Sequence, residues 1–331
     1  MRPLILCGAG SCGGYALTYL RSSGKAPSAF VDNSPSKWGT SVSGIPVMSL
    51  PEAHKMYPDG EYVVTIQRHD YASQIRLQLR SSGIDPVSLD VVLPTFREVP
   101  SRRVSSHLAW IVDDDETVRV LLDQYKFRET HDYELQLPPS PIEETYFPDF
   151  MAHIDDEVFV DVGAASGDTL ASFMQWSGGK YRALFAVEPD PENFGKIPEL
   201  PRLTTCQCAL SDHDGHERFL ATGSWDARLD EGGEEKVQCK RLDHLYFGIP
   251  PTYIKMDIEG SELEALWGAR ETIQKYSPVL AICAYHKPSH LWDIPFLIHA
   301  LNPEYSLRLR RYAEGAAELV WYAFPNSRVK P

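Results

Sequence analysis

The chain has 331 residues, of which 43% are hydrophobic, and it carries a net charge of −14 at neutral pH. The length predicts about two domains at roughly 100–200 residues each, and the composition is that of a globular protein that buries a full core. No part of the chain has a marked basic surplus, which argues against a nucleic-acid partner. No apolar run reaches the roughly 18–20 residues of a membrane span. The six cysteines contain no CxxC pair, which argues against a zinc cage or a disulfide framework.

The first hundred residues alternate short β-branched runs with helical patterns, which predicts an open, doubly wound parallel sheet. Helical spacing is clearest in HDYASQIRLQLRSSG, which starts at His69 and ends at Gly83, a residue suited to a helix C-terminus. The expected strands are Leu4–Leu6, Ala29–Val31, Val47, Tyr62–Thr65 and Pro86–Val92.

A glycine-rich turn follows the first of these strands. The stretch CGAGSCGG gives Gly8-x-Gly10-x-x-Gly13, and AFVDN places Asp32 19 residues after Gly13. This is a dinucleotide fingerprint, in which phosphates lie over backbone amides at a helix start and the acid binds the ribose. The turn itself holds no Lys or Arg, and the amides would not need one. The glycines also interrupt the apolar N-terminal stretch, which argues against a secretion signal and predicts a cytoplasmic protein.

The piece that follows, VDNSPSKWGTSVSGIPVMSLPEA, resembles the nucleotide-sugar-binding domain of bacterial sugar acetyltransferases of the PglD type, over about residues 3–50. About 100 residues are too few for the second βαβαβ half of a dinucleotide fold. A mononucleotide or nucleotide-sugar site is therefore favoured over a nicotinamide site. The alternative of a degenerate domain that is kept only for packing or dimerisation stays open, as does assembly of the chain into a homo-oligomer.

Strand signals stop between about Val104 and Glu144. The stretch SSHLAWIVDDDETVRVLLDQYKF predicts a helix, and LPPSPIEETYFPD reads as an exposed proline-rich connector. We therefore predict a Rossmann-like nucleotide-binding domain over 1–100, a helical and proline-rich connector over 101–145 and a second domain over 146–331.

The second half repeats the strand–helix alternation and predicts a second Rossmann-like parallel sheet. Its last segment, YSLRLRRYAEGAAELVWYAFP, alternates on both sides of Glu314-Gly315 and predicts a β-hairpin. A parallel sheet that ends in an antiparallel hairpin is the topology of class I S-adenosylmethionine-dependent methyltransferases. The other expected strands are Val158–Val162, Ala183–Val187, Leu203–Ala209, Tyr253–Met256 and Val279–Ala284.

A second glycine turn, DVGAASG, places Asp161 inside the strand, two residues before Gly163. The glycines would let the backbone approach a ligand and point amides at it, and Asp161 would bind the ammonium group of a methionine-like ligand. Glu188 ends the next strand, where an acid accepts hydrogen bonds from both ribose hydroxyls. The segment ALSDHDGHERF follows the third strand and would contact adenine. The expected cofactor residues are Asp161, Gly163, Ala164, Gly167, Thr169, Glu188, Ala209, Leu210 and Asp212.

The segments FVDVGAASGDT, FAVEPDPENF, CALSDHDGHERF and YIKMDIEGSELEALWGARETIQKYSPVLAI occur in the order and spacing of one family. They resemble the FkbM family of methyltransferases over about Tyr146 to Pro325. The resemblance implies an O-methyltransferase that uses S-adenosylmethionine and acts on a hydroxyl of a sugar, glycan or natural product. Most relatives have GANxG in the first motif, where this chain has Ala165-Ser166-Gly167.

The segments IKMDIEGSE and VLAICAYHK deliver polar side chains to the carboxyl ends of two strands. An alcohol acceptor must lose a proton, and a histidine with a pKa near neutrality is the expected base. We therefore predict His286 as the base, with Asp257 orienting it or the acceptor. The same acids could instead cap a helix, and Asp257, Glu259 and His286 could hold a divalent metal, although the spacing does not require one.

Two other functions stay open at this point: an NAD-dependent oxidoreductase and a non-enzymatic nucleotide-sugar-binding protein, each using the first glycine turn. The glycine-rich stretch ATGSWDARLDEGGEEKV is either a cover over the acceptor, with Trp225 as a platform for a sugar ring, or a plain surface loop.

Overall fold

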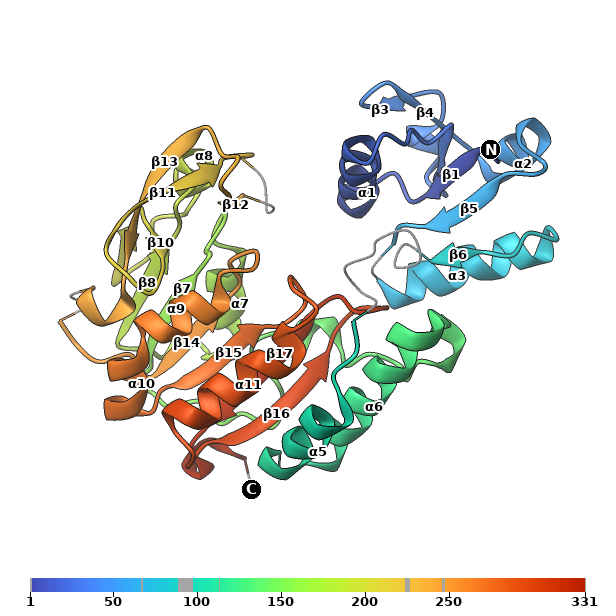
Figure 1. The fold of residues 1–331 in the computed structure, drawn as a ribbon. Helices are drawn as coiled ribbons and strands as arrows, with labels where there is room; N and C mark the ends of the chain where they lie inside the picture. Colours follow the sequence, from blue (N-terminus) through green and yellow to red (C-terminus); the bar gives the residue numbers. More distant parts are fainter. Residues whose placement is uncertain are drawn as a thin grey trace. The chain divides into compact units, whose positions relative to one another are not determined.

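The computed structural model describes residues 2–66, 68–88, 98–112, 114–223, 227–245 and 248–330. Figure 1 shows the chain coloured along its sequence. Unit 1 comprises Met1–Val99, Asp123–Pro139 and Ala313–Ala317, and unit 2 comprises Pro100–Leu122, Ser140–Tyr312 and Glu318–Pro331. The division falls within helix α6 (Asp115–Thr130) and at the tip of a C-terminal hairpin. The domain bounds drawn from the sequence stay a prediction.

Unit 1 contains a six-stranded sheet in the order β3-β4-β2-β1-β5-β6 (Figure 1). All neighbouring strands are parallel except β3 and β4. The chain therefore winds in one direction from β1 to β4 and in the other from β1 to β6, which confirms the predicted doubly wound sheet. The bounds are β1 (Leu4–Cys7), β2 (Ala29–Val31), β3 (Ser41–Val42), β4 (Ile45–Met48), β5 (Glu61–Val64) and β6 (Val87–Ser88). The predicted strand Pro86–Val92 is described only to Ser88, because 89–97 lie outside the described residues.

Helices cover both faces of this sheet because the central strands β1 and β2 are apolar at every position. Ile5 packs on one face with Ile75 and Leu79 of α3, whereas its neighbour Leu6 packs on the other with Leu17 of α1. The helices are α1 (Ser11–Ser22), α2 (Leu50–Met56) and α3 (His69–Ser81). Alternate side chains point to opposite faces of a strand, so a continuous apolar run requires cover on both.

Unit 2 contains a seven-stranded sheet in the order β16-β17-β15-β14-β7-β8-β9 (Figure 1). Its strands are parallel except β17, which runs antiparallel to both neighbours. This confirms the predicted C-terminal hairpin. The bounds are β7 (Val158–Val162), β8 (Ala183–Val187), β9 (Leu203–Cys206), β14 (Tyr253–Met256), β15 (Val279–Cys283), β16 (Ser306–Arg311) and β17 (Leu319–Phe324).

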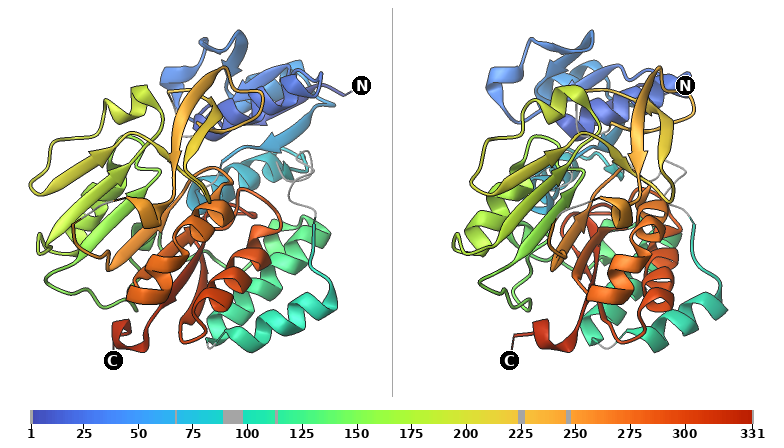
Figure 2. Two further views of the ribbon diagram at one scale, coloured as in Figure 1. Left: turned by 60° about the vertical axis from the view of Figure 1, so that its left-hand side comes forward. Right: turned by 90° about the vertical axis from the view of Figure 1, so that its left-hand side faces the viewer.

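The seven-stranded sheet is also covered on both faces. On one face Phe159 of β7 stacks on Phe173 of α7 (Asp168–Trp176), with ring centroids 4.5 Å apart. On the other, α9 and α11 lie side by side in orange and red, as Figure 2 shows. The remaining helices of unit 2 are α5 (Arg102–Ile111), α8 (Pro191–Phe194), α9 (Glu262–Gly268), α10 (Arg270–Tyr276) and α11 (His290–Leu301). Short 3-10 helices are η1 (Pro35–Lys37), η3 (Tyr133–Leu135), η4 (Ile142–Glu144), η5 (Leu242–His244) and η6 (Asn326–Arg328).

Three local expectations differ from the structure. The helix predicted between residues 105 and 127 is two helices, α5 and α6, because the Asp114 carboxylate accepts hydrogen bonds from the amides of Glu116 and Thr117 and so starts a new helix. The strand predicted over Leu203–Ala209 is divided between β9 and β10 (Ala209–Leu210), which lie in different sheets.

The third difference is in the predicted polar loop after the third strand, which contributes β12 (Arg228–Leu229) and β13 (Glu235–Lys240). With β10 and β11 (Gly215–Leu220) these form a four-stranded sheet in the order β10-β13-β11-β12, with a small core around Phe219. Trp225 lies outside the described residues. Across the described part of the chain, every helix is too short or too polar to cross a membrane.

Candidate functional site in unit 2

The side chains predicted to do chemistry come together at one edge of the seven-stranded sheet. Gly163 follows β7, Glu188 follows β8, Asp257 follows β14 and His286 lies just beyond β15. These four strands are parallel neighbours, so their carboxyl ends share an edge, where open α/β sheets bind ligands.

An ion pair lies beneath this edge. Lys255 and Asp161 face each other in the register of β14 and β7, and the ammonium Nζ lies 3.0 Å from the carboxylate Oδ1. Burial alone would lower the pKa of Lys255, but Asp161 and Asp257 together raise it. Nζ also donates to the Gly163 carbonyl at 2.8 Å. Asp161, expected from the sequence to bind the ammonium group of a ligand, thus holds an ammonium group of the protein and supports the glycine turn.

The two glycines of this turn are required by close contacts within the protein. Gly163 has φ +73°, and a Cβ there would lie 1.9 Å from the Asp257 carbonyl oxygen. Gly167 has φ +86°, and a Cβ there would lie 2.6 Å from Cδ of Pro198. The Gly163 amide donates to the Val187 carbonyl at 2.9 Å, and the Gly167 amide to the Ala164 carbonyl at 2.7 Å. In the structure these two amides therefore shape the turn, whereas the sequence had suggested that they point at a ligand.

Glu188 is a buried carboxylate at the tip of β8, with 4% of its surface exposed. Its Oε2 accepts the Ala165 amide at 2.8 Å and its Oε1 accepts the Asp190 amide at 2.9 Å. A carboxylate oxygen can accept two hydrogen bonds, so among the residues that the structure describes each oxygen keeps one lone pair that no donor uses. Burial raises the pKa of Glu188.

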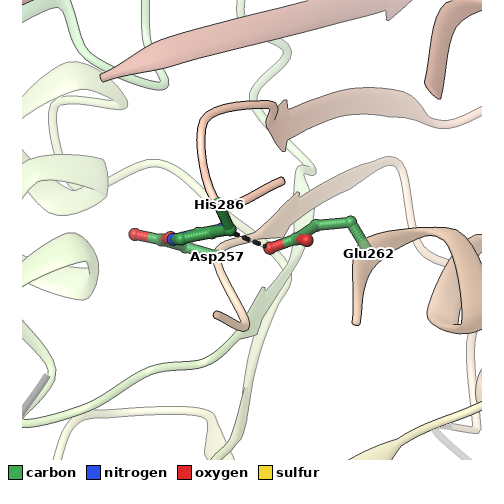
Figure 3. A group of neighbouring side chains, drawn as sticks. All are labelled: Asp257, Glu262 and His286. Atoms are coloured by element: carbon green, nitrogen blue, oxygen red, sulfur yellow. Dashed lines mark hydrogen bonds and ion pairs between the residues drawn. The ribbon is translucent and has the colours of Figure 1, made fainter. Parts of the chain in front are cut away.

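Asp257 and His286 form the centre of a cluster of acids. Asp257 accepts hydrogen bonds from the hydroxyl groups of Tyr146 (2.8 Å, to Oδ2) and Tyr285 (3.2 Å, to Oδ1). Nδ1 of His286 lies 2.8 Å from Oε1 of Glu262, as Figure 3 shows. Its other nitrogen, Nε2, lies 3.3 Å from Oδ1 of Asp257 and 3.4 Å from Oε1 of Glu259.

The surrounding acids change what His286 can do. Burial alone would lower its pKa, but Glu262 and Glu259 raise the pKa of the imidazole well above its ordinary value. The two acids therefore favour the protonated form of the ring. The assignment of His286 as the base stays a prediction.

Sequence reasoning missed four members of this cluster: Tyr146, Glu262, Tyr285 and Glu318. Burial, together with Asp257, raises the pKa of Glu318 to about 7. Tyr285 precedes His286 and Glu262 lies in the IEGSE segment, so the two motifs themselves contain a signal for both residues. Tyr146 and Glu318 are far away in the chain and carried no sequence signal.

The remaining predicted cofactor residues differ in location and in burial. Ala164 and Thr169 are buried next to the second glycine turn. Ala209 and Leu210 form β10 of the small sheet and are buried, whereas the Asp212 carboxylate is partly exposed and lies 2.8 Å from Nδ1 of His213.

Unit 1 has a pocket of about 470 Å³ at the carboxyl ends of β1, β2 and β5. Gly8 and Gly10 of the first glycine turn lie in its wall, as do Asp32, Lys37 and Arg68. A Cβ on Gly10 would meet nothing within 4 Å, so this residue faces open space. A Cβ on Gly13 would lie 2.0 Å from the Gly8 carbonyl oxygen, so that glycine is required by the packing of α1 on the turn.

Asp32 holds this turn in place. Its Oδ2 accepts hydrogen bonds from the Ala9 amide and from Nζ of Lys37, both at 2.9 Å, and its Oδ1 accepts the Ser34 amide at 2.9 Å. Burial alone would raise the pKa of Asp32, but these hydrogen bonds outweigh it and lower the pKa. Nζ of Lys37 also donates to the Ala9 carbonyl at 3.2 Å. The sequence showed no basic residue in the turn, but the fold brings Lys37 beside it.

The sheet order of unit 2, its one antiparallel strand and the acid at the tip of β8 define a class I methyltransferase fold. Residues 161–304 match the family model described as Methyltransferase FkbM domain. Among solved structures, the methyltransferase FkbM from Methylobacillus flagellatus KT matches with a TM-score of 0.74 and 24% identity, over 97% of this chain and 90% of that chain. These matches confirm the predicted fold class and the predicted resemblance of the second half.

Two further structures match over a smaller share of this chain. One is a precorrin-6y C5,15-methyltransferase from Geobacter metallireducens GS-15 (TM-score 0.33, 14% identity, 56% of this chain and 86% of that chain). The other is an rRNA methylase from Streptococcus thermophilus (TM-score 0.35, 12% identity, 57% of this chain and 99% of that chain). No curated protein matches the sequence. The resemblance of residues 3–50 to a nucleotide-sugar-binding domain stays a prediction.

Proposed function

We propose that the protein is an S-adenosylmethionine-dependent O-methyltransferase, with the cofactor at the carboxyl ends of β7 and β8. The observation that carries the proposal is Glu188, a buried carboxylate at the tip of the second strand of a methyltransferase sheet, with hydrogen-bonding capacity to spare. Two vicinal ribose hydroxyls match the two unused lone pairs.

The charged side chains near the second glycine turn suit this cofactor. When bound, S-adenosylmethionine supplies an electrophilic methyl group on a positively charged sulfonium. Three acids, Asp257, Glu259 and Glu262, lie around His286, and an acidic site favours a cationic ligand. The proposed contacts to the rest of the cofactor are Asp161 of β7, Gly163, Ala164 and Gly167 of the turn and Thr169 of α7. Ala209, Leu210 and Asp212 remain the proposed adenine contacts.

The acceptor hydroxyl is placed, in this proposal, at Asp257 and His286. Its oxygen forms a bond to the methyl carbon while the carbon–sulfur bond breaks and leaves its electron pair on sulfur. Such a displacement depends chiefly on alignment. The hydroxyl proton passes to this cluster, in which His286 is the base predicted from the sequence and the carboxylates of Asp257 and Glu259 are the alternative acceptors. If a carboxylate takes the proton, His286 serves to orient Asp257 and Glu259.

The acceptor class follows from the family resemblance: a hydroxyl of a sugar, a glycan or a natural product. The alternative of an NAD-dependent oxidoreductase is not favoured, because residues 161–304 match the methyltransferase FkbM family model and the chain matches the structure of a methyltransferase FkbM.

Titration calorimetry of the full chain with S-adenosylmethionine and S-adenosylhomocysteine tests the cofactor. Transfer of a labelled methyl group to a panel of sugars, oligosaccharides and polyketide alcohols then tests the acceptor, with the matching deoxy compounds as controls. Failure of both nucleosides to bind at millimolar concentration would overturn the proposal.

We further propose that the pocket of unit 1 binds a nucleotide or nucleotide-sugar. The first glycine turn, the start of α1 and the Lys37 ammonium meet at this pocket, and each favours phosphate. Nζ of Lys37 has three donors, of which Asp32 and the Ala9 carbonyl take two. Titration calorimetry of the full chain with UDP-sugars, AMP and NAD tests this proposal. If none of these ligands gives a heat of binding, the proposal falls and the pocket is a structural feature only.

A further inference from the structure

We infer that Cys206 and Cys208 form a redox-active dithiol: a low-molecular-weight disulfide modifies Cys206, and Cys208 then closes an intramolecular disulfide. The two residues flank Gln207 in the segment between β9 and β10. Here the chain passes from the seven-stranded sheet to the four-stranded one.

The two sulfur atoms are already in contact. Sγ of Cys206 lies 3.4 Å from Sγ of Cys208. The backbone brings them together, because the Cys208 amide donates to the Cys206 carbonyl at 3.2 Å and closes a tight turn around Gln207. A disulfide bond is roughly 2.0 Å long, so the sulfur atoms need to approach by roughly 1.4 Å, a movement that rotation of the two side chains can provide.

The surroundings make the two thiols chemically different. Cys206 is half-buried, whereas Cys208 is buried. The hydrogen bond from Cys208 lowers the pKa of the Cys206 thiol, and the ammonium group of Lys240 lowers it further, against the opposing effect of burial. Lys240 belongs to β13 and faces Leu210 in the register of β10. The same hydrogen bond, together with burial, raises the pKa of Cys208. Because the thiolate is the nucleophile, Cys206 attacks first.

The other cysteines of the chain provide a contrast. Burial raises the pKa of Cys7, Cys239 and Cys283. A thiol that stays protonated in apolar surroundings is inert. Cys12 is half-buried in unit 1 and supplies a control outside the proposed pair.

The reaction balances with a low-molecular-weight disulfide as the oxidant. The Cys206 thiolate attacks one sulfur of that disulfide, so that a mixed disulfide forms and one thiolate leaves. Cys208 then gives its proton to solvent, and its sulfur attacks Sγ of Cys206 and expels the second thiolate. The two protein thiols are oxidised by two electrons, and the small disulfide is reduced to two thiols.

Oxidation of this pair reaches the candidate cofactor site, a consequence that rests on the proposed function. The Cys206 carbonyl accepts the Glu188 amide at 3.1 Å, and Cys208 directly precedes Ala209 and Leu210, the proposed adenine contacts. Closing the disulfide draws Cys208 toward Cys206 and so moves these backbone groups. We expect oxidation to weaken binding of S-adenosylmethionine about 5–150-fold, the usual range of coupling between two sites.

Mass spectrometry of the full chain tests the dithiol itself. The reduced protein is incubated with oxidised glutathione, and the remaining thiols are alkylated in denaturant. Trypsin then releases Leu203–Arg218, a peptide whose only cysteines are Cys206 and Cys208. This peptide should carry no alkyl group and be two hydrogen atoms lighter than the reduced peptide. In Cys208→Ser the glutathione should remain on Cys206, in Cys206→Ser the thiol of Cys208 should be alkylated, and Cys12→Ser should behave like the wild type.

A wild-type peptide that is alkylated at both cysteines, or glutathione on Cys208 in Cys206→Ser, would overturn the inference. Calorimetry of the reduced and the oxidised chain with S-adenosylmethionine tests the link to the cofactor, and equal affinities would refute that link. If the disulfide forms but neither form of the chain binds S-adenosylmethionine, the dithiol stands and the proposed function falls.

Discussion

Lys255 and Asp161 occupy facing positions on the neighbouring strands β14 and β7, and their charged groups meet at 3.0 Å in the interior of unit 2. The pair lies beneath the glycine turn that follows β7, and Lys255 also donates to the Gly163 carbonyl. The ion pair thus connects the stability of the sheet to the shape of the candidate cofactor site.

Removing one partner of this pair should be strongly destabilising. Lys255→Met leaves the Asp161 carboxylate buried without a counter-charge, and we expect the free energy of unfolding to fall by ~3–5 kcal/mol. Lys180 and Asp155 provide the control: they are 3.2 Å apart but 62% and 71% exposed. Lys180→Met should change the free energy by less than ~1 kcal/mol. Urea unfolding at pH 7 measures both, and equal effects would contradict the prediction.

Glu188→Ala should weaken binding of S-adenosylmethionine by ~1.5–3 kcal/mol, the usual loss for hydrogen bonds to a charged group. Because Glu188 also holds the amides of Ala165 and Asp190, Glu188→Gln should be measured beside it. Glu199→Ala, at an exposed site of the same unit, is the matched control. Calorimetry that gives one affinity for all three variants would rule out Glu188 as a ribose ligand.

Gly163→Ala should destabilise the protein more than Gly179→Ala. Both glycines have a left-handed φ, +73° and +75°, so an alanine at either costs roughly 1–2 kcal/mol. Only at Gly163 would the new Cβ also press on the Asp257 carbonyl, since at Gly179 nothing lies within 4 Å. The difference between the melting temperatures of the two variants measures the cost of the contact with the Asp257 carbonyl, because the cost of the left-handed backbone is common to both. A Gly163→Ala variant as stable as Gly179→Ala would mean that the turn can move away from β14.

Gly10→Val should abolish nucleotide binding in unit 1 without harming the fold. The backbone at Gly10 has φ −107° and ψ −164°, which any residue adopts, and its Cβ would point into open space. A branched side chain there would occupy the volume proposed for phosphate. Gly14→Val, also with no atom within 4 Å of the new Cβ, should leave binding intact. Binding of S-adenosylmethionine should be unaffected in both, and nucleotide affinity equal to wild type in Gly10→Val would exclude the turn as the phosphate site.

Glu318 should make the protein less stable above neutral pH. Its folded-state pKa of about 7 lies above the value of 4.5 for an unperturbed Glu, chiefly because of burial. The protonated form is therefore favoured by folding, and this contribution is fully present below pH 4.5 and is lost as the pH rises through about 7. Glu318→Gln, which stays neutral, should reduce the difference in melting temperature between pH 6 and pH 8. The exposed Glu304→Gln should not. A difference that persists in Glu318→Gln would assign the pH dependence to other groups.

The sequence alone determined the two parallel sheets and the edge at which the candidate site lies. Strands such as Val158–Val162 are continuous apolar runs, and the polar residue that ends each run must lie at the carboxyl edge of the sheet. For this reason Glu188, Asp257 and His286 could be placed at one edge before their geometry was known. The alternation on both sides of Glu314-Gly315 likewise determined the hairpin, because hairpin strands are neighbours in the chain.

Only the tertiary structure decided how these residues are partnered. Tyr146 reaches Asp257 across 111 positions of the chain, and Lys37 meets Ala9 across 28. No local pattern encodes such contacts, because periodicity describes how a segment meets the core and not which distant side chain it meets there. The raised pKa of His286 is likewise a property of the folded state, because only folding places the ring next to Glu262 and Glu259.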